Sequence, residues 1–228
     1  MRRMTYKNYR GWIASLALLS LPFGDAWAQD VELLVTHVAV SNGADGVRRS
    51  TEFSERVSRT KDSLWISRVL AADAHSDGGH THAKNDKAHK HIDVTTATRW
   101  LTRDATGALS MRLVPNDKKV LVAVSKTDYS NIGFDGSWAA AWSLIDPASL
   151  KRMKAGVGAG DLTTYTLVEQ DRTVKVIWNA RLQIPVSVES ADKNTRRETI
   201  VKVVKKSSSR PWDKLEGFTR KDYSDYLD

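Results

Sequence analysis

The sequence predicts an antiparallel, strand-rich domain of the α+β class, and three observations support this. Short runs of β-branched and apolar residues recur along the chain, separated by turns rich in Gly, Asn, Asp and Pro. Helix signals are confined to two short segments near the middle of the chain. The 228 residues contain no cysteine, so the fold is held without disulfides. Short strands at this spacing predict either two packed sheets or one wrapped antiparallel sheet.

Three strands are expected in the N-terminal part. Residues 31–40 end at a turn and are compatible with a strand or with part of a helix, and their length and valine content favour a strand. Residues 51–59 and 62–70 follow as a strand pair. His37 stands alone in the first apolar run, so we expect it to be a packed core histidine. Alternation divides the third strand into two faces, one with Leu64, Ile66 and Arg68 and the other with Trp65, Ser67 and Val69.

The middle of the chain predicts a strand and then a hairpin. Residues 92–103 form the strand and lead into a turn at 104–107. The hairpin pairs residues 109–114 with residues 120–125 across the Pro-Asn-Asp turn at 115–118.

The helical signals come next. Residues 134–145 contain three alanines and two tryptophans spaced i,i+4, which favours a helical turn capped by Ser137. Asp146 precedes a proline and is expected to cap a short helix at 147–154. The three glycines within 156–160 predict a flexible link.

Four strands are expected in the C-terminal part, at residues 162–169, 173–179, 185–190 and 199–204. A tail at 206–228 follows, which either docks its aromatic residues on the domain or stays loose.

Residues 1–28 have the three parts of a secretory signal peptide. Basic residues precede an apolar run at 12–21, and Ala26-Trp27-Ala28 offers a cleavage site before Gln29. Ten apolar residues fall short of the roughly 20 that span a bilayer. We therefore expect a bacterial periplasmic or secreted protein with no transmembrane segment in the mature chain.

Composition limits what the mature chain binds. Residues 29–205 are long enough for one domain, which contains a histidine-rich loop at 73–93. The net charge of +8 lies partly in the signal peptide, and basic residues are not gathered with stacking aromatics. Nucleic acid is therefore not an expected partner.

Several short motifs resemble the LolA-like periplasmic proteins of the outer-membrane lipoprotein-sorting superfamily. Residues 165–178 and 182–189 resemble that family's hairpin with a "lglPvrvE" strand, and residues 64–68 resemble its early "LWvkrP" strand. Residues 133–138 with 146–147 resemble its "sDGktlW…P" hairpin. The resemblance implies an unclosed half-barrel wrapped around short helices, with an apolar concavity for acyl chains or an apolar partner. An all-β sandwich is the alternative, because strand spacing alone does not separate the two.

The chain departs from this family pattern in four places. Val69 stands where the family has proline, and the histidine-rich loop separates the early strands. The chain also lacks a clear long N-terminal helix and carries a long C-terminal extension. These departures bear more on the carrier function than on the fold.

The histidine-rich loop is the strongest compositional bias in the chain. Five of the six histidines fall within seventeen residues, which predicts a Cu(II), Zn(II) or Ni(II) site with nitrogen and oxygen ligands. A solvated loop that binds metal opportunistically and a pH-responsive loop are the alternatives. The candidate ligands are His75, His80, His82, His89 and His91, completed by Asp73, Asp77, Asp86 or Asp93.

Tryptophans are the candidates for an apolar pocket, because each supplies a large contact area with one donor. Ordinary packing in the core and on the sheet is the alternative. The pocket candidates are Trp65, Trp100, Trp138, Trp142 and Trp178.

Catalytic signatures are missing. The sequence has no cysteine nucleophile, no Gly-x-Ser-x-Gly motif and no His-Glu-x-x-His motif. The sequence therefore predicts a non-enzymatic periplasmic binding or carrier protein for an apolar or lipid-like ligand, or for an apolar protein partner. The alternative is a periplasmic metal-binding protein that acts through the histidine-rich loop.

Overall fold

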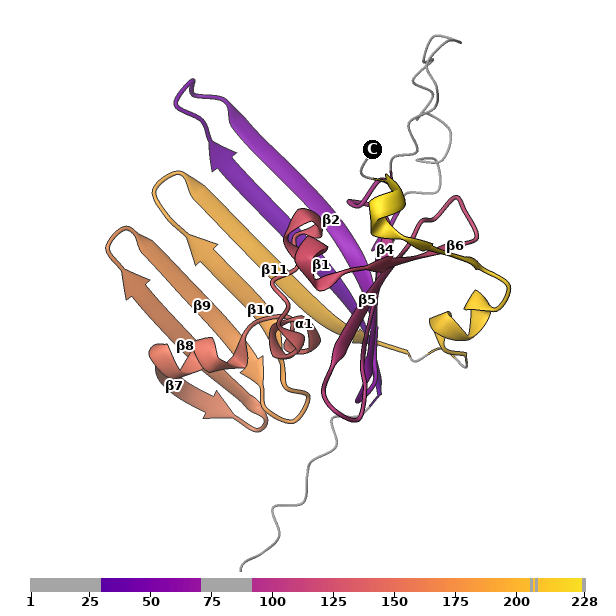
Figure 1. The fold of residues 1–228 in the computed structure, drawn as a ribbon. Coiled ribbons are helices and arrows are strands. Elements are labelled where there is room, and N and C mark those ends of the chain that lie inside the picture. The colour runs from indigo at the N-terminus through magenta and orange to yellow at the C-terminus, as the bar shows by residue number, and fades with distance from the viewer. Residues whose placement is uncertain (1–29, 71–91, 206, 208, 227–228) are drawn as a thin grey trace, which may run out of the picture.

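The computed structural model describes residues 30–70, 92–205, 207 and 209–226. Twelve strands form one sheet (Figure 1). The first six are β1 (Val31–Asn42), β2 (Arg48–Arg59), β3 (Ser63–Val69), β4 (Thr98–Arg103), β5 (Leu109–Val114) and β6 (Val120–Val124). The others are β7 (Lys154–Ala159), β8 (Leu162–Glu169), β9 (Arg172–Asn179), β10 (Ile184–Ala191), β11 (Thr195–Val204) and β12 (Thr219–Asp222).

The strand order is β12-β6-β5-β4-β3-β2-β1-β11-β10-β9-β8-β7. Neighbours are antiparallel except β12 and β6, which are parallel, and the end strands β12 and β7 leave the sheet unclosed. The predicted strand-rich, antiparallel, unclosed sheet is therefore confirmed. The strands form one continuous sheet rather than the two packed sheets of a sandwich.

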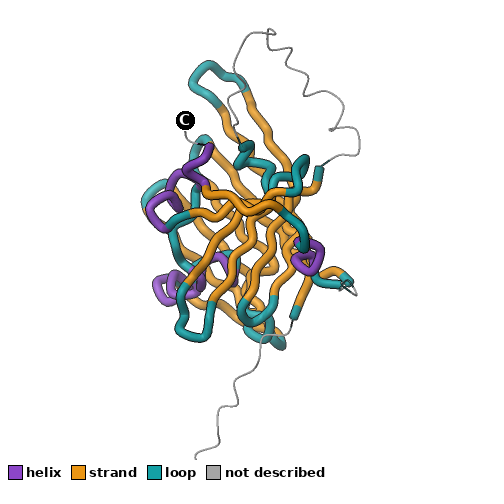
Figure 2. The backbone as a smooth tube through the Cα atoms, turned by 45° about the vertical axis from the view of Figure 1, so that its right-hand side comes forward, coloured by secondary structure: helices purple, strands orange, loops and turns teal. Residues whose placement is uncertain are grey.

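Helices are short, so the α+β label holds only loosely. The described residues contain one α-helix, α1 (Trp138–Ser143). The remaining turns are of 3₁₀ type: η1 (Lys126–Ile132), η2 (Pro147–Arg152), η3 (Pro211–Leu215) and η4 (Tyr223–Tyr226). Strands dominate the described chain (Figure 2). None of these helices is long and apolar enough to cross a membrane.

Both predicted helix caps are present. The Ser137 Oγ accepts a hydrogen bond from the Ala140 amide at 3.1 Å, and the Asp146 carboxylate accepts one from the Ala148 amide at 3.0 Å. Both caps satisfy amides that the first helical turn leaves without a partner.

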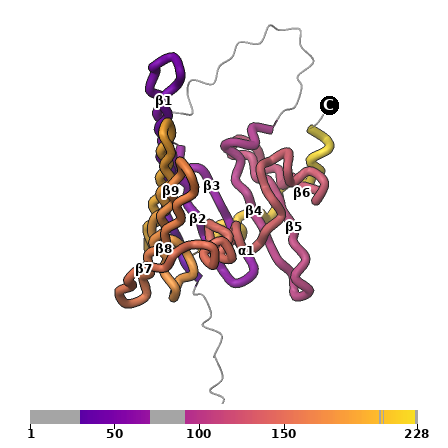
Figure 3. Tube along the Cα trace, turned by 90° about the vertical axis from the view of Figure 1, so that its left-hand side faces the viewer, coloured from indigo at the N-terminus to yellow at the C-terminus, as the bar shows by residue number. Residues whose placement is uncertain are grey.

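The sheet is bent, and α1 lies inside the bend. Figure 3 shows β1, β8 and β9 on one side and β5 and β6 on the other, with α1 between them. We call the face toward α1 the concave face; it carries Leu33, Val57 and Leu113, which are almost fully buried. The opposite, convex face carries Trp65 and Trp100, which are cross-strand partners. The main core therefore lies inside the bend.

The main core joins strands β1 to β6 with η1 and η4, and Ile184 of β10 and Val201 of β11 extend it into the neighbouring strands. Leu64, Leu101 and Val122 come from the sheet, and Tyr129 and Tyr223 cover them from the two turns. A smaller cluster holds the far part of the sheet: Leu150, Val176 and Trp178. Burial is thus concentrated in one half of the sheet.

Two predicted segments differ in the structure. Residues 92–97 were expected to belong to a strand, but β4 begins at Thr98. The Asp93 carboxylate accepts hydrogen bonds from the Thr95 and Thr96 hydroxyls at 2.6 and 2.7 Å, which holds a turn instead.

The predicted flexible link at 156–160 is mostly strand β7, paired with β8. A Cβ on Gly158 would lie 2.8 Å from the Leu162 carbonyl oxygen, so the glycine permits this close pairing. The prediction of a flexible link is therefore wrong for this segment, because Gly158 allows two strand backbones to approach closely.

The C-terminal segment extends the sheet. Strand β12 pairs with β6, and Tyr223 and Tyr226 of η4 are buried in the main core. The predicted signal peptide at 1–28 lies outside the described residues.

Candidate binding cavity on the concave face

A cavity of about 370 Å³ lies between the concave face and the segment around α1. The sheet supplies one wall, and residues 133–145 supply the other. Its apolar lining is Val35, Ile66, Leu101, Met111, Phe134, Ala140, Ala141, Leu144, Ile145 and Val188. Its polar lining is His37, Glu55, Arg99, Asp135 and Thr199.

Strand alternation places the sheet wall. Leu33, Val35 and His37 follow one another at every second position of β1, so all three face the concave side. In the neighbouring strands, Glu55 is the register partner of Val35, and Arg99 is the partner of Ile66. The apolar side chains of Val35 and Ile66 therefore lie beside a row of polar side chains on the same face. We call His37, Glu55, Arg99 and Thr199 the polar row.

The second wall is fixed by its backbone and by one arginine. Leu144 ends α1 in the left-handed conformation at φ 64°, and both it and Ile145 line the cavity. The buried Arg59 guanidinium donates to the carbonyl oxygens of Trp142 at 2.9 Å and Leu182 at 2.6 Å. The same guanidinium lies 3.7 Å from the centre of the Trp142 ring. Arg59 thus ties α1 and the β9–β10 connection to the sheet.

Burial lowers the pKa of Arg59 to about 10, so the side chain stays charged at neutral pH. Among the described residues its Nε has no hydrogen-bond partner, and no carboxylate pairs with it. The Trp142 ring and the two carbonyls therefore stabilise this charge inside the protein.

The polar row forms one connected network. The Glu55 carboxylate lies 2.8 Å from an Arg99 nitrogen and 3.4 Å from His37 Nε2. His37 Nδ1 shares a 3.1 Å hydrogen bond with the Thr199 hydroxyl. The Phe53 ring lies 4.7 Å from the His37 imidazole, centre to centre. The Arg68 guanidinium lies 3.6 Å from the centre of the Phe53 ring. Strands β11, β1, β2, β3 and β4 each contribute a member.

Charge pairing controls the ionisation of Glu55. Burial alone would raise its pKa, but the His37 hydrogen bond and the Arg99 charge outweigh burial, so the pKa lies below the ordinary value. Glu55 is therefore a carboxylate at neutral pH and fixes the orientation of both neighbours.

Thr199, His37 and Glu55 form a hydroxyl–imidazole–carboxylate series, the order that nucleophilic catalysis uses. All three lie inside central strands, where the backbone amides donate hydrogen bonds to carbonyl groups of the neighbouring strands. These strands offer no free pair of amides for an oxyanion, and Arg99 shares the carboxylate. The Glu55 carboxylate is therefore shared between the imidazole of His37 and the guanidinium of Arg99.

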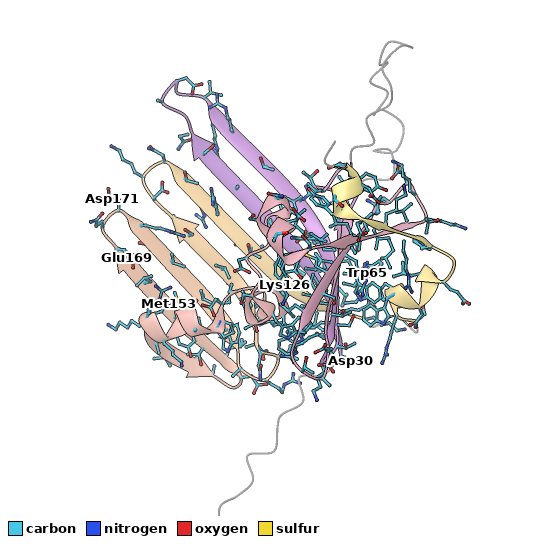
Figure 4. All side chains as sticks on the ribbon, in the orientation of Figure 1. Asp30, Trp65, Lys126, Met153, Glu169 and Asp171 are labelled. Carbon is cyan, nitrogen blue, oxygen red and sulfur yellow. The ribbon has the colours of Figure 1, made fainter. Side chains whose placement is uncertain are left out.

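The predicted pocket tryptophans lie elsewhere. Trp65 and Trp100 are on the convex face, 6.4 Å apart, and Figure 4 labels Trp65 near the C-terminal segment. Trp178 is buried in the smaller cluster, and Trp138 and Trp142 lie on α1. Trp142 contacts Arg59, and Arg103 lies 5.0 Å over Trp138. None of the five lines the concave cavity. Alternation turns Trp65 and Trp100 to the convex face, Trp138 and Trp142 lie against arginines, and Trp178 is on the concave face but packs with Leu150 in the smaller cluster.

The predicted histidine ligands lie outside the described residues, because all five fall within 71–91. Of the predicted completing carboxylates, Asp93 is described, and it accepts hydrogen bonds from the Thr95 and Thr96 hydroxyls. The residues that the structure does describe contain no group of three or more metal-ligating side chains. Metal binding by the histidine-rich loop stays a prediction.

Glu55 and Arg99 are not among the site residues predicted from the sequence, and His37 is predicted there only as a packed core histidine. The sequence contained a signal for this site. His37 lies two positions after Val35 and four after Leu33, and Glu55 lies two positions before Val57, so each shares a face with buried apolar residues. Charged residues at inward positions of strands indicate a polar site in an apolar wall.

Neither a protein-family model nor a curated protein sequence matches the chain. Among solved structures, the chain is similar to a LolA superfamily protein from Nitrosomonas europaea, with 10% identity and a TM-score of 0.36. That match covers 84% of this chain and 90% of that one. A putative outer membrane lipoprotein-sorting protein domain from Vibrio parahaemolyticus is similar at 10% identity and a TM-score of 0.32. It covers 82% of this chain and 89% of that chain.

The PNGF-II structure is similar at 12% identity and a TM-score of 0.37, covering 86% of this chain. This chain spans only 32% of the length of PNGF-II. The resemblance to LolA-like proteins noted in the sequence thus recurs among solved structures.

Proposed function

We propose that the protein is a non-enzymatic binding protein of the bacterial cell envelope that holds an apolar or lipid-like ligand. The observation that carries the proposal is the concave cavity of about 370 Å³, which falls within the roughly 300–1,000 Å³ of small-molecule sites. An apolar segment of a protein partner is an alternative occupant of the same cavity. The signal-peptide pattern of residues 1–28 supports an envelope location.

An alkyl chain suits the apolar walls. Phe134, Leu144 and Ile145 lie on one wall, and Ile66 and Met111 lie on the other. Each buried methylene contributes about 0.8 kcal/mol. Affinity should therefore rise with chain length until the cavity is filled.

The polar row suits the polar end of the ligand. Arg99 carries a positive charge, whereas Glu55 and Asp135 carry negative charges, so no single sign dominates the lining. Arg99 keeps donors beyond its bond to Glu55, and Thr199 offers a hydroxyl. This set supports a neutral polar group, such as an ester or hydroxyl, more than a free acid or amine.

The test is a calorimetric titration of the mature protein with 1-monoacylglycerols of increasing chain length. We expect affinity to rise about fourfold per added methylene before levelling off. Ala141→Glu places a charge in the cavity wall and should abolish binding. Ala139→Glu is the matched control, because Ala139 is exposed on the same helix. Absence of binding at every chain length, or equal binding by the two variants, would overturn the proposal.

Metal binding is the second candidate function, and its support is the clustering of five histidines within 73–93. Calorimetry with Cu(II) should show binding that the joint replacement of His80, His82, His89 and His91 by Ala removes. Affinity no tighter than that of a free peptide of the same loop would contradict it.

A further inference from the structure

A second cavity, of about 390 Å³, lies on the convex side, where the C-terminal strand joins the sheet. Trp100, Arg112 and Ala123 are successive register partners across β4, β5 and β6. Alternation gives them the face opposite Leu101 and Met111, so this cavity is separate from the concave one. Its lining is Trp100, Arg112, Leu121, Ala123, Arg220, Lys221 and Asp222.

Arg112 is held in place by its neighbours. Its guanidinium lies 5.0 Å from the centre of the Trp100 ring, and NH1 donates to the Thr102 hydroxyl at 3.4 Å. The Trp100 ring is itself fixed, because Nε1 donates to the Ser63 hydroxyl at 2.9 Å. Within the described part of the chain, no carboxylate forms an ion pair with Arg112. Most of its donors are therefore oriented and still available.

Parallel pairing of β12 with β6 brings a second arginine to this surface. Arg220 is the register partner of Leu121, and Asp222 is the partner of Ala123. Arg220 is exposed, and it too has no ion-pair partner among the residues that the structure describes. Two chain segments about 100 residues apart thus build one basic site.

The local charge is positive. Two arginines, Arg112 and Arg220, line the cavity with one carboxylate, Asp222. Lys221 borders it through its backbone, but alternation turns its side chain to the other face of β12, where its Nζ lies 5.7 Å from the Tyr226 ring. Burial and then the charge of Arg220 lower the pKa of Arg112, against a smaller opposing effect of Tyr129. The two guanidiniums therefore repel each other across the cavity, and an anion between them would relieve that repulsion.

We propose that this cavity binds a phosphate group, held between Arg112 and Arg220. The planar guanidinium fork matches phosphate oxygens in a bidentate fashion. The buried Leu121 side chain forms an apolar part of the lining and reduces screening there, which strengthens the attraction. The phosphate belongs to a small phosphate ester or to a phospholipid head group; both share this chemistry.

The first experiment titrates the mature full-length protein with glycerol 3-phosphate at low salt. Arg112→Gln and Arg220→Gln should each weaken binding at least about tenfold, since each removes charge-assisted hydrogen bonds. Arg48→Gln is the matched control, because Arg48 is an exposed arginine on the distant β1–β2 hairpin. Monoacylglycerol binding in the concave cavity should not change in these variants. Should Arg112→Gln fail to fold, Arg220→Gln at its exposed position carries the test.

The second experiment identifies the source of the phosphate. The protein is sedimented with vesicles of phosphatidylcholine alone or with added phosphatidylglycerol. Binding of glycerol 3-phosphate that both variants weaken supports the site and identifies a small phosphate ester as the ligand. Binding only to the vesicles with phosphatidylglycerol, weakened by both variants, supports the site and identifies a phospholipid head group. Binding of neither probe overturns the proposal, as does binding that Arg48→Gln weakens equally.

Discussion

The sheet has two halves that differ in how they are held. In the half from β1 to β6, Leu33, Leu64 and Leu113 are fully buried under η1 and η4. In the half from β11 to β7, which we call the wing, Val157 is 96% exposed and Val168 is 69% exposed. Side chains crowd around the first half and are sparse over the wing (Figure 4). The concave cavity lies where the covered half ends, so incomplete covering of one sheet creates the binding space.

The largest expected effect tests this difference directly. Leu113→Ala should cost about 2–5 kcal/mol of unfolding free energy, because it opens a cavity in a fully buried site. Leu162→Ala in the wing, where Leu162 is 37% exposed, should cost less than about 1 kcal/mol. Urea unfolding measures both, and equal costs would show that the two halves do not differ.

The next prediction concerns the link between α1 and the sheet. Arg59→Met should cost about 2–4 kcal/mol, because the buried carbonyls of Trp142 and Leu182 lose their donors. Arg48→Met, at an exposed position, should be close to neutral. Thermal unfolding compares the two variants, and a neutral Arg59→Met would mean that packing alone holds α1.

A third prediction concerns acid stability at the cavity wall. The lowered pKa of Glu55 contributes stability that is present above its ordinary value of 4.5 and is lost as pH falls through the folded-state pKa. Glu55→Gln should cost on the order of 1 kcal/mol at pH 7 and flatten the stability profile below about pH 4.5. Unfolding in urea from pH 7 to pH 3 measures this. The exposed Glu52→Gln on the same strand is the control, and an identical profile in both would contradict the role of the network.

The smallest effect is expected at the wing edge. Gly158→Ala should loosen β7, because the new Cβ would meet the Leu162 carbonyl oxygen at 2.8 Å. Gly156→Ala should do less, since its nearest contact is 3.4 Å. Hydrogen exchange of β7 amides should rise at least about tenfold in the first variant, with a global stability loss below about 1 kcal/mol. Equal exchange in both variants would contradict this.

Local patterns predicted most of the fold. Strand positions followed from period-two alternation, and Ser137 and Asp146 were recognised as caps because those side chains satisfy free amides. The failures came from competing local forces. Asp93 organises a turn where apolar content suggested a strand, and Gly158 permits close pairing where glycine suggested flexibility.

The candidate site was less predictable, because long-range register creates it. His37, Glu55 and Arg99 are far apart in sequence and meet only through the pairing of β1 to β4. The tryptophans were the natural pocket candidates from composition. Alternation sends Trp65 and Trp100 to the convex face, and the Arg59 contact occupies Trp142. Residue type alone could not reveal which face each side chain shares.

The central claim is that the space between α1 and the concave face holds the ligand. Photolabelling tests this claim most directly. A monoacylglycerol with a terminal diazirine is irradiated with the mature protein, and labelled peptides are mapped by mass spectrometry. We expect label on Met111, Leu144 and Ile145, which line the two walls, and loss of that label in Ala141→Glu. Label concentrated on the wing strands β7 and β8, or around Trp65 on the convex face, would contradict the account.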